Sequence, residues 1–217
     1  ALLPLSDIET DGTLTLAVFN PTPGGGTSSL VVQQVGFPAP ELTSVTPDQA
    51  FIGSPPFTLT LRGQNFQPFS VVLWNGTPRS TNFRSSTELQ IAVTAADLRQ
   101  AGSASLSVRT QGPGGGSSRS ASLTILNPAP ALTRLSPSRT FAGSSGVDLV
   151  LEGTGFTTDS RVVWNGTSRA ATFVSATQLR LQVAATDLAI VGSVSVAIVN
   201  PAPGGGTSNV IPFQIEP

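Results

Sequence analysis

The sequence lacks most of the side chains that carry enzyme chemistry. Its 217 residues include no cysteine, histidine, tyrosine, methionine or lysine, so every basic residue is an arginine. A thiolate nucleophile, an imidazole base, a Schiff-base lysine and the usual zinc ligands are therefore excluded. Only carboxylates and hydroxyls remain for chemistry, and we expect a protein that is not an enzyme and needs no cofactor.

Charge and long apolar runs are also scarce. Charged residues make up 11% of the chain and the formal net charge is −1, so the long-range field attracts neither nucleic acid nor an anionic membrane. No run of about eighteen apolar residues occurs, and we expect no membrane insertion. A near-neutral surface favours association with other proteins. The absence of cysteine is compatible with the cytosol and with bacterial surface proteins that do without disulfides.

An internal repeat of 90 residues organises the chain. Trp74 and Trp164 lie 90 positions apart, as do Pro113 and Pro203, and Pro23 precedes Pro113 by the same interval. This spacing predicts one complete unit over residues 38–127 and a second over residues 128–217. Residues 1–37 align with the last part of a third unit.

The hydrophobic pattern within each unit has the period of a β-strand. Apolar and polar residues alternate in Thr58–Leu61, Leu179–Val183 and Ser193–Val199. Turn signals such as Asn-Gly and Pro-Gly-Gly-Gly recur between these strands, which is typical of an all-β sandwich. Only the stretches beginning at Thr94 and Ala184 favour short helical turns. The sequence therefore predicts tandem immunoglobulin-sized sandwiches joined by short proline-containing segments.

Several motifs occur in the same order in both complete units. The first copies are Pro40–Pro47, Gly63–Phe66, Val72–Thr77 and Gly114–Ser118. This order resembles the bacterial IPT/TIG domain repeat, which implies an immunoglobulin-like fold. The resemblance covers both complete units, and the N-terminal piece matches the final third of the family's pattern. It implies little about activity, because this fold serves in spacers, adhesins, sugar-binding domains and DNA-binding proteins.

Three glycine-rich stretches allow three interpretations: phosphate cradles, flexible linkers or hairpin turns. They begin at Asn20, Gln111 and Asn200. A phosphate loop of the Walker type needs a lysine and a following helix, whereas here a strand pattern stands on both sides. We therefore expect hairpin loops, in which glycine supplies positive φ angles and proline fixes the entry to the turn.

The two tryptophans have a structural and a functional interpretation. Trp74 and Trp164 each precede an Asn-Gly turn and share a strand face with Val72 and Val162. The structural interpretation is a core residue bridging two sheets. The functional one is a platform for stacking sugars, with Asn75 or Asn165 as a polar contact. Both asparagines also lie in an N-glycosylation sequence, although a tight turn is the favoured interpretation.

The carboxylates do not suggest a catalytic pair. Asp97, Asp187 and Asp7 occupy equivalent positions at the start of the short helical turns, where an acid caps free backbone amides. Asp148, Glu152 and Asp159 occur only in the last unit, where Thr58, Arg62 and Phe69 stand 90 positions earlier. We expect neither a glycosidase pair nor a calcium site from them.

The N-terminal piece contains a hairpin pattern with apolar residues. Leu14, Leu16 and Val18 alternate along one strand, and Leu30 and Val32 lie in or beside its partner. A lone hairpin is marginally stable, so we expect this one to be completed. Either it belongs to a longer multi-repeat protein, which is the favoured interpretation, or another molecule supplies the remaining strands and the hairpin is an assembly device.

Together these observations favour a non-enzymatic, extracellular or cell-surface repeat protein of bacterial type. It would act as a spacer, or as a subunit of a fibre, filament or sheath held by non-covalent contacts of strand edges and faces. Expected partners are further copies or neighbouring repeats. The alternative is a carbohydrate-binding or adhesion module with a cell-surface glycan as partner. Exposed tryptophans would favour the alternative and buried ones the spacer.

Overall fold

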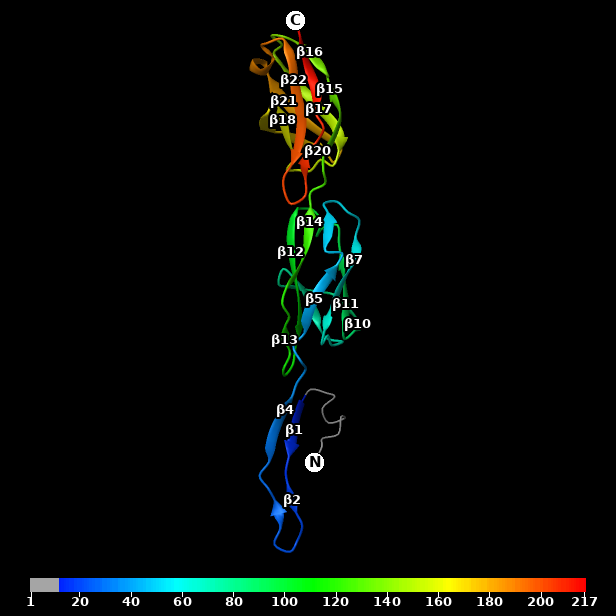
Figure 1. Ribbon diagram of the computed structural model, residues 1–217, viewed down its shortest axis with the longest axis vertical. Coiled ribbons are helices and arrows are strands. Elements are labelled where there is room, and N and C mark those ends of the chain that lie inside the picture. The colour runs from blue at the N-terminus through cyan, green and yellow to red at the C-terminus, as the bar shows by residue number, and fades with distance from the viewer. Residues whose placement is uncertain (1–11) are drawn as a thin grey trace. The chain divides into compact units, whose positions relative to one another are not determined.

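The computed structural model describes residues 12–217, where almost all regular structure is β-strand (Figure 1). Two compact units can be distinguished. One comprises the chain up to Asp48 with Pro55–Thr94 and Ser103–Leu123, and the other comprises Gln49–Ser54, Ala95–Gly102 and Thr124–Pro217. Over the described residues the strands form six sheets.

The first two sheets form a long N-terminal hairpin. Its strands are β1 (Gly12–Leu16), β2 (Phe19–Asn20), β3 (Gly26–Thr27) and β4 (Val31–Val35). β1 pairs antiparallel with β4, and β2 pairs antiparallel with β3 around the first glycine-rich loop. The sequence pattern of two alternating strands around a glycine-rich turn is therefore confirmed here.

The middle of the chain forms a four-stranded and a six-stranded sheet. The first has the order β10-β11-β7-β5, with strands β5 (Glu41–Thr46), β7 (Phe57–Gln64), β10 (Thr81–Ser85) and β11 (Glu88–Val93). The second has the order β6-β14-β12-β8-β9, with β13 beside β12. Its strands are β6 (Gln49–Phe51), β8 (Val71–Trp74), β9 (Thr77–Arg79), β12 (Gly102–Thr110), β13 (Gly116–Ser117) and β14 (Ala121–Leu126). β6 runs parallel to β14.

The C-terminal part repeats this topology strand for strand. Its four-stranded sheet has the order β15-β17-β21-β20, with strands β15 (Ala131–Ser136), β17 (Gly146–Thr154), β20 (Thr172–Ser175) and β21 (Gln178–Ala184). Its second sheet has the order β16-β24-β22-β18-β19, with β23 beside β22. The strands are β16 (Arg139–Phe141), β18 (Arg161–Trp164), β19 (Thr167–Ala170), β22 (Gly192–Asn200), β23 (Gly206–Thr207) and β24 (Ile211–Glu216).

Alternating residues of facing sheets build the C-terminal core. One cluster of buried side chains joins the four-stranded sheet to its partner; it includes Leu149, Leu151, Leu179, Leu181, Val196, Ile198 and Phe213. The middle sheets bury the corresponding side chains, such as Leu59 and Leu61 of β7. Side chains of period two therefore meet between two sheets. The predicted immunoglobulin-like sandwich is confirmed.

A close approach explains why glycine stands three residues before phenylalanine in both units. A Cβ atom on Gly153 would collide with the carbonyl oxygen of Ala131 on the neighbouring strand and would lie 2.5 Å from the ring of Phe156. Phe156 is buried. Glycine thus allows the ring to close over the strand, which is a packing requirement and not a ligand-binding one.

The predicted helical turns are mostly absent. In the described part of the chain the one short helical element is the 3₁₀ turn η2 (Ala185–Leu188), while residues 95–98 form non-helical turns. Segments this short gain too few hydrogen bonds to propagate an α-helix.

Candidate functional site

The glycine-rich stretches close three equivalent hairpins, as predicted. The residue pairs that close them are Asn20 with Gly26, Thr110 with Gly116 and Asn200 with Gly206. A serine after each loop donates its backbone N–H to the opposite strand at 2.8 Å; these are Ser28, Ser118 and Ser208. The three hairpins are therefore closed by equivalent residue pairs and an equivalent serine.

The third loop holds the segment that leads into the C-terminal sandwich. Asn127, which follows β14, donates its backbone N–H to the carbonyl oxygen of Pro203 at 2.8 Å. Its own carbonyl accepts the N–H of Gly205 at 2.8 Å. Its side-chain Nδ2 reaches the carbonyl of Pro201 at 2.9 Å. We call this set of contacts around Asn127 the second joint.

Two further asparagines extend the second joint. Asn200, at the end of β22, donates through Nδ2 to the carbonyls of Pro128 at 2.8 Å and Gly155 at 2.6 Å. Asn209 bonds the backbone of Leu132 in both directions, at 3.0 Å to its N–H and 2.8 Å to its carbonyl. The amides of Asn127 and Asn200 satisfy backbone groups of loops, and Asn209 satisfies backbone groups at the start of β15. Apart from one isolated bridge between Asn127 and Gly204, the incoming chain is therefore held without a strand pairing.

The first joint repeats the central contact with different side chains. Phe37, 90 positions before Asn127, donates its N–H to the carbonyl of Pro113 at 2.8 Å. Its ring packs edge-on against Phe69, with 5.1 Å between ring centroids. Asp159 occupies the position of Phe69 in the later unit. The backbone contact is therefore common to both joints, and the side chains that support it are not.

The sequence predicts short proline-containing segments at the joints but not their contacts with the glycine-rich loops. Asn127 and Asn209 have no predicted role, although Asn-Pro precedes the glycines at Asn20 and Asn200 and recurs at Asn127. That recurrence was the available signal. It does not show the partners, because Asn127 and Pro203 lie 76 positions apart in the chain.

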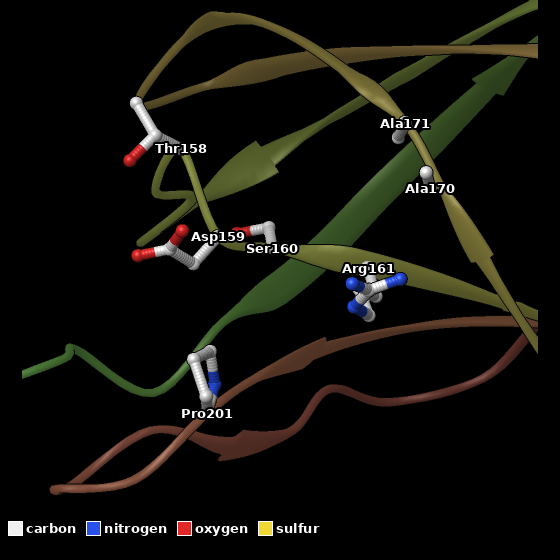
Figure 2. Close-up of a pocket in the computed structure, with 7 residues that line it drawn as sticks. All are labelled: Thr158, Asp159, Ser160, Arg161, Ala170, Ala171 and Pro201. Atoms are coloured by element: carbon white, nitrogen blue, oxygen red, sulfur yellow. The ribbon is translucent and has the colours of Figure 1, made fainter.

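A shallow pocket lies beside the third loop. It is lined by Thr158, Asp159, Ser160, Arg161, Ala170, Ala171 and Pro201. Figure 2 shows Pro201 of the hairpin on one side and the two alanines on the other. The lining contains one carboxylate, whereas glycoside hydrolysis requires two. Phe69 and Val71 replace Asp159 and Arg161 in the middle unit, so this polar pocket is not a repeated feature.

Both tryptophans lie in the sandwich cores. Trp74 is 7% exposed and Trp164 is 3% exposed. The ring of Trp164 contacts Phe213 at a centroid distance of 5.4 Å, and the guanidinium of Arg169 lies 5.9 Å from its centroid. In the middle unit Arg79 lies over Trp74 at 5.1 Å. Both indoles are thus buried with an arginine over the ring, as the structural interpretation expects. The role of Trp74 and Trp164 as a platform for sugars stays a prediction.

Asn75 and Asn165 form the predicted tight turns. Their φ angles are 49° and 47°, and each is followed by a glycine with positive φ, which is the type I′ pattern. The Oδ1 of Asn75 accepts the N–H of Ser105 at 2.7 Å. Both asparagines are exposed at hairpin tips. Their role as glycan contacts stays a prediction.

Asp187 has a different main partner from the one expected. Its carboxylate forms a two-pronged ion pair with Arg169, with Oδ1 at 2.6 Å from Nη2. This hydrogen bond is the main reason that the pKa of Asp187 lies below its ordinary value, and a hydrogen bond from the backbone of Ala184 adds to the effect. The capping role is thus secondary to the ion pair. Asp7 lies outside the described residues.

Two of the three acids found only in the last unit make surface ion pairs. Asp148 lies 3.1 Å from Arg180, and Glu152 lies 3.9 Å from Arg134. Within residues 12–217, no group of three or more His, Cys, Asp or Glu side chains is arranged to hold a metal ion. Over the same residues, no helix has the length and apolar character needed to cross a membrane.

The family model of the IPT/TIG domain matches residues 40–125 and again residues 130–215. The chain belongs to the IPT/TIG domain family. The N-terminal hairpin lies outside the two matches. No curated protein sequence matches this chain significantly.

Solved structures with similar folds come from diverse proteins. The plexin A4 extracellular region has 15% identity and a TM-score of 0.35, covering 81% of this chain and 18% of that one. A protein crystallised with a xylogluco-oligosaccharide has 15% identity and a TM-score of 0.43, covering 81% and 41%. The Bacteroides ovatus protein SGBP-B, in complex with a mixed-linkage heptasaccharide, has 15% identity and a TM-score of 0.32, covering 94% and 53%. The IPT/TIG chain therefore spans about a fifth to a half of these proteins.

Proposed function

We propose that this chain is a non-catalytic structural protein, an extracellular spacer or assembly subunit of a bacterial cell surface built from IPT/TIG repeats. The repeat boundaries lie at Phe37 and Asn127, and a Pro-Gly loop of the following repeat binds each boundary residue. The observation that carries the proposal is this shared backbone contact, Phe37 to Pro113 and Asn127 to Pro203, each at 2.8 Å.

Such a contact suits a protein that must transmit force. A free linker extends at low force, whereas a linker bonded to the next sandwich resists until its hydrogen bonds break. The bonds of the second joint lie mostly on buried or half-buried residues, and Asn127 itself is 1% exposed. Protection from water raises the cost of leaving these groups unpaired.

Lateral assembly has a plausible route in the strand edges. β10 and β20 are edge strands of the two four-stranded sheets, so their outer backbone groups have no partner within the sheet. The near-zero net charge does not oppose contact between copies. A fibre or sheath subunit would use these edges.

Single-molecule stretching tests the spacer role. Pulling the chain between its ends should give two separate unfolding events, each releasing about 300 Å of chain. Leu151→Ala removes a fully buried side chain of the C-terminal core and should weaken one event only. Ser168→Ala, at an exposed position of β19, is the matched control and should leave both unchanged. Extension without resolved events would contradict the proposal.

A glycan screen separates the spacer from the alternative function. The intact chain is titrated with xyloglucan and mixed-linkage glucan oligosaccharides while tryptophan emission is followed. With both indoles buried, we expect no saturable change. A saturable response that is lost in Asn75→Ala or Asn165→Ala, and kept in Ser168→Ala, would replace the spacer proposal by carbohydrate binding.

A further inference from the structure

Strand β19 is a free edge of the six-stranded sheet in the C-terminal sandwich. It stands last in the order β16-β24-β22-β18-β19, and in the described part of the chain it pairs only with β18. Its residues are exposed apart from Arg169, which is half-buried. The backbone of such an edge pairs readily with another strand unless something blocks it.

The hydrogen-bond pattern shows which residues of β19 turn their backbone groups outward. Asn165, directly after β18, donates its N–H to the carbonyl of Ser195 in β22 at 2.8 Å. Because backbone groups alternate sides along a strand, Val163 also directs its groups towards β22. Ser168 pairs with Val163 in the register and therefore directs its N–H and C=O away from β18. Two residues further on, Ala170 does the same.

The middle repeat blocks the same edge with a proline. Pro78 stands 90 positions before Ser168, and it pairs with Leu73 as Ser168 pairs with Val163. Proline has no N–H to donate, and at an outward position it prevents pairing with another strand. β9 is also one residue shorter than β19. Of the two complete repeats, only the C-terminal one therefore offers this edge to a partner.

The other edges of the C-terminal sandwich are less suited to pairing. β20 has a shift of register between Phe173 and Ser175, and such a bulge twists an edge away from a partner. At β15, the side chain of Asn209 already bonds the backbone N–H and C=O of Leu132. β16 is three residues long. β19 combines a regular register with unblocked outward groups.

We propose that β19 pairs with β19 of a second copy, antiparallel and across a two-fold axis, with Ser168 of each copy opposite Ala170 of the other. The pairing rests on the assembly role proposed above and specifies its partner. In this register both outward residues are used, and the two copies exchange four N–H···O=C bonds. A strand whose outward residues lie symmetrically about its centre matches itself, as a two-fold interface requires.

The residue on the two-fold axis does not oppose this contact. Arg169 of one copy would face Arg169 of the other, and like charges directly opposite are unfavourable. Each guanidinium, however, already forms its ion pair with Asp187, so the charges are offset within each copy. Four backbone bonds make a weak contact, which a fibre multiplies along its length.

Small side chains leave room for the second copy. Ser168 and Ala170 are exposed, and Ala170 and Ala171 lie along one side of the shallow pocket (Figure 2). In the proposed register Ala171 is followed across the axis by Thr167 of the other copy. The hairpin tip of that copy therefore meets the rim of the pocket and not a bulky side chain.

Disulfide trapping tests the register, because the chain has no cysteine of its own. Ser168→Cys and Ala170→Cys chains are oxidised in air, each alone and mixed. Opposite residues of a hydrogen-bonded pair have Cα atoms about 5.5 Å apart, within disulfide range. Identical positions are offset by two residues and lie beyond the limit of about 7 Å. We expect the mixture to give at least about tenfold more cross-linked dimer than either variant alone. Equal or greater linkage of Ser168→Cys to itself would overturn the register, and so would the absence of any linkage.

A proline variant tests the backbone contact without cysteine. Ser168→Pro copies Pro78 of the middle repeat at a position whose N–H is not used within the sheet, so the sandwich should stay folded. The NMR signal of the Ala170 amide should shift with protein concentration in the original chain. Ser168→Pro should lose this shift, whereas Ser168→Ala, which keeps the N–H, should retain it. A shift that persists in Ser168→Pro would overturn the pairing.

The two proposals can fail separately. Neither Ser168→Pro nor the cysteine variants change a residue of the joints, so the stretching experiment should give the same two events in all of them. If the mixed disulfide forms while stretching shows no resolved events, the spacer role is wrong and the pairing stands. If the two events appear without the mixed disulfide, the spacer role stands and the pairing of β19 is wrong.

Discussion

Replacing Gly204 by alanine is predicted to open the second joint while its sandwich stays folded. Gly204 has a φ angle of +70°, and a Cβ atom there would lie 2.5 Å from the carbonyl oxygen of Asn127. Alanine in the left-handed region costs about 1–2 kcal/mol. The added methyl group also displaces Asn127, whose two backbone bonds to the loop contribute about 0.5–1.5 kcal/mol each. The joint should lose about 2–5 kcal/mol in total.

Gly206→Ala is the matched control in the same hairpin. Gly206 also has a positive φ angle, +117°, but nothing lies within 4 Å of the position of its Cβ. It therefore introduces backbone strain without contact with the joint. The N–H of Asn127 serves as reporter in both variants, because it is bonded to Pro203 in the folded chain.

Amide exchange measured by NMR gives the comparison. Exchange of the Asn127 amide should be about tenfold to a hundredfold faster in Gly204→Ala than in Gly206→Ala, since about 1.4 kcal/mol corresponds to a factor of ten. Amides of β22 should keep their rates in both. Equal rates at Asn127 in the two variants would refute the reasoning that the loop holds the joint by close contact.

Three further predictions follow from single side chains. Trp164→Ala should lower the stability of the C-terminal sandwich by about 3–5 kcal/mol. Thermal unfolding should then show one transition at a lower temperature and the other unchanged. A shift of both transitions would contradict separate cores. Asp187 binds its proton less tightly in the folded state, so its pairing with Arg169 stabilises the protein above about pH 4 and is lost as pH falls through the lowered pKa. Asp187→Asn should lower stability by about 1–3 kcal/mol at pH 7, and the urea midpoint of the variant should fall less steeply as the pH is lowered. An unchanged dependence of the urea midpoint on pH would contradict this. Phe69→Ala should speed exchange of the Phe37 amide about threefold to tenfold by removing the ring contact, and an unaltered rate would show that the backbone bond suffices.

Local patterns allowed much of the fold to be predicted from the sequence. Alternation predicted a strand at Thr58–Leu61, and Asn75-Gly76 predicted a tight turn, because both depend on residues adjacent in the chain. The 90-residue frame added the equivalence of the two sandwiches. The glycine-rich loops were correctly assigned as hairpins for the same local reason.

The candidate site was less predictable because its contacts are distant in sequence. The partner of Asp187 in the 3₁₀ turn η2 is Arg169 on strand β19, and a capping role was the local alternative. The face on which Val32 lies depends on pairing with Thr15 across the hairpin, which composition does not determine. The bonds of Asn127 to the loop likewise depend on how the incoming chain meets the sandwich.

The two joints show which part of the contact the sequence must preserve. The first uses an aromatic pair, Phe37 with Phe69, and the second uses buried amides at Asn127 and Asn200. These side chains have opposite chemistry, yet the N–H of the boundary residue meets the loop carbonyl at 2.8 Å in both. Because the common bond is made by backbone atoms, it leaves the supporting side chains free to differ. Each joint can therefore have its own strength while the bond from the boundary residue to the loop carbonyl is kept.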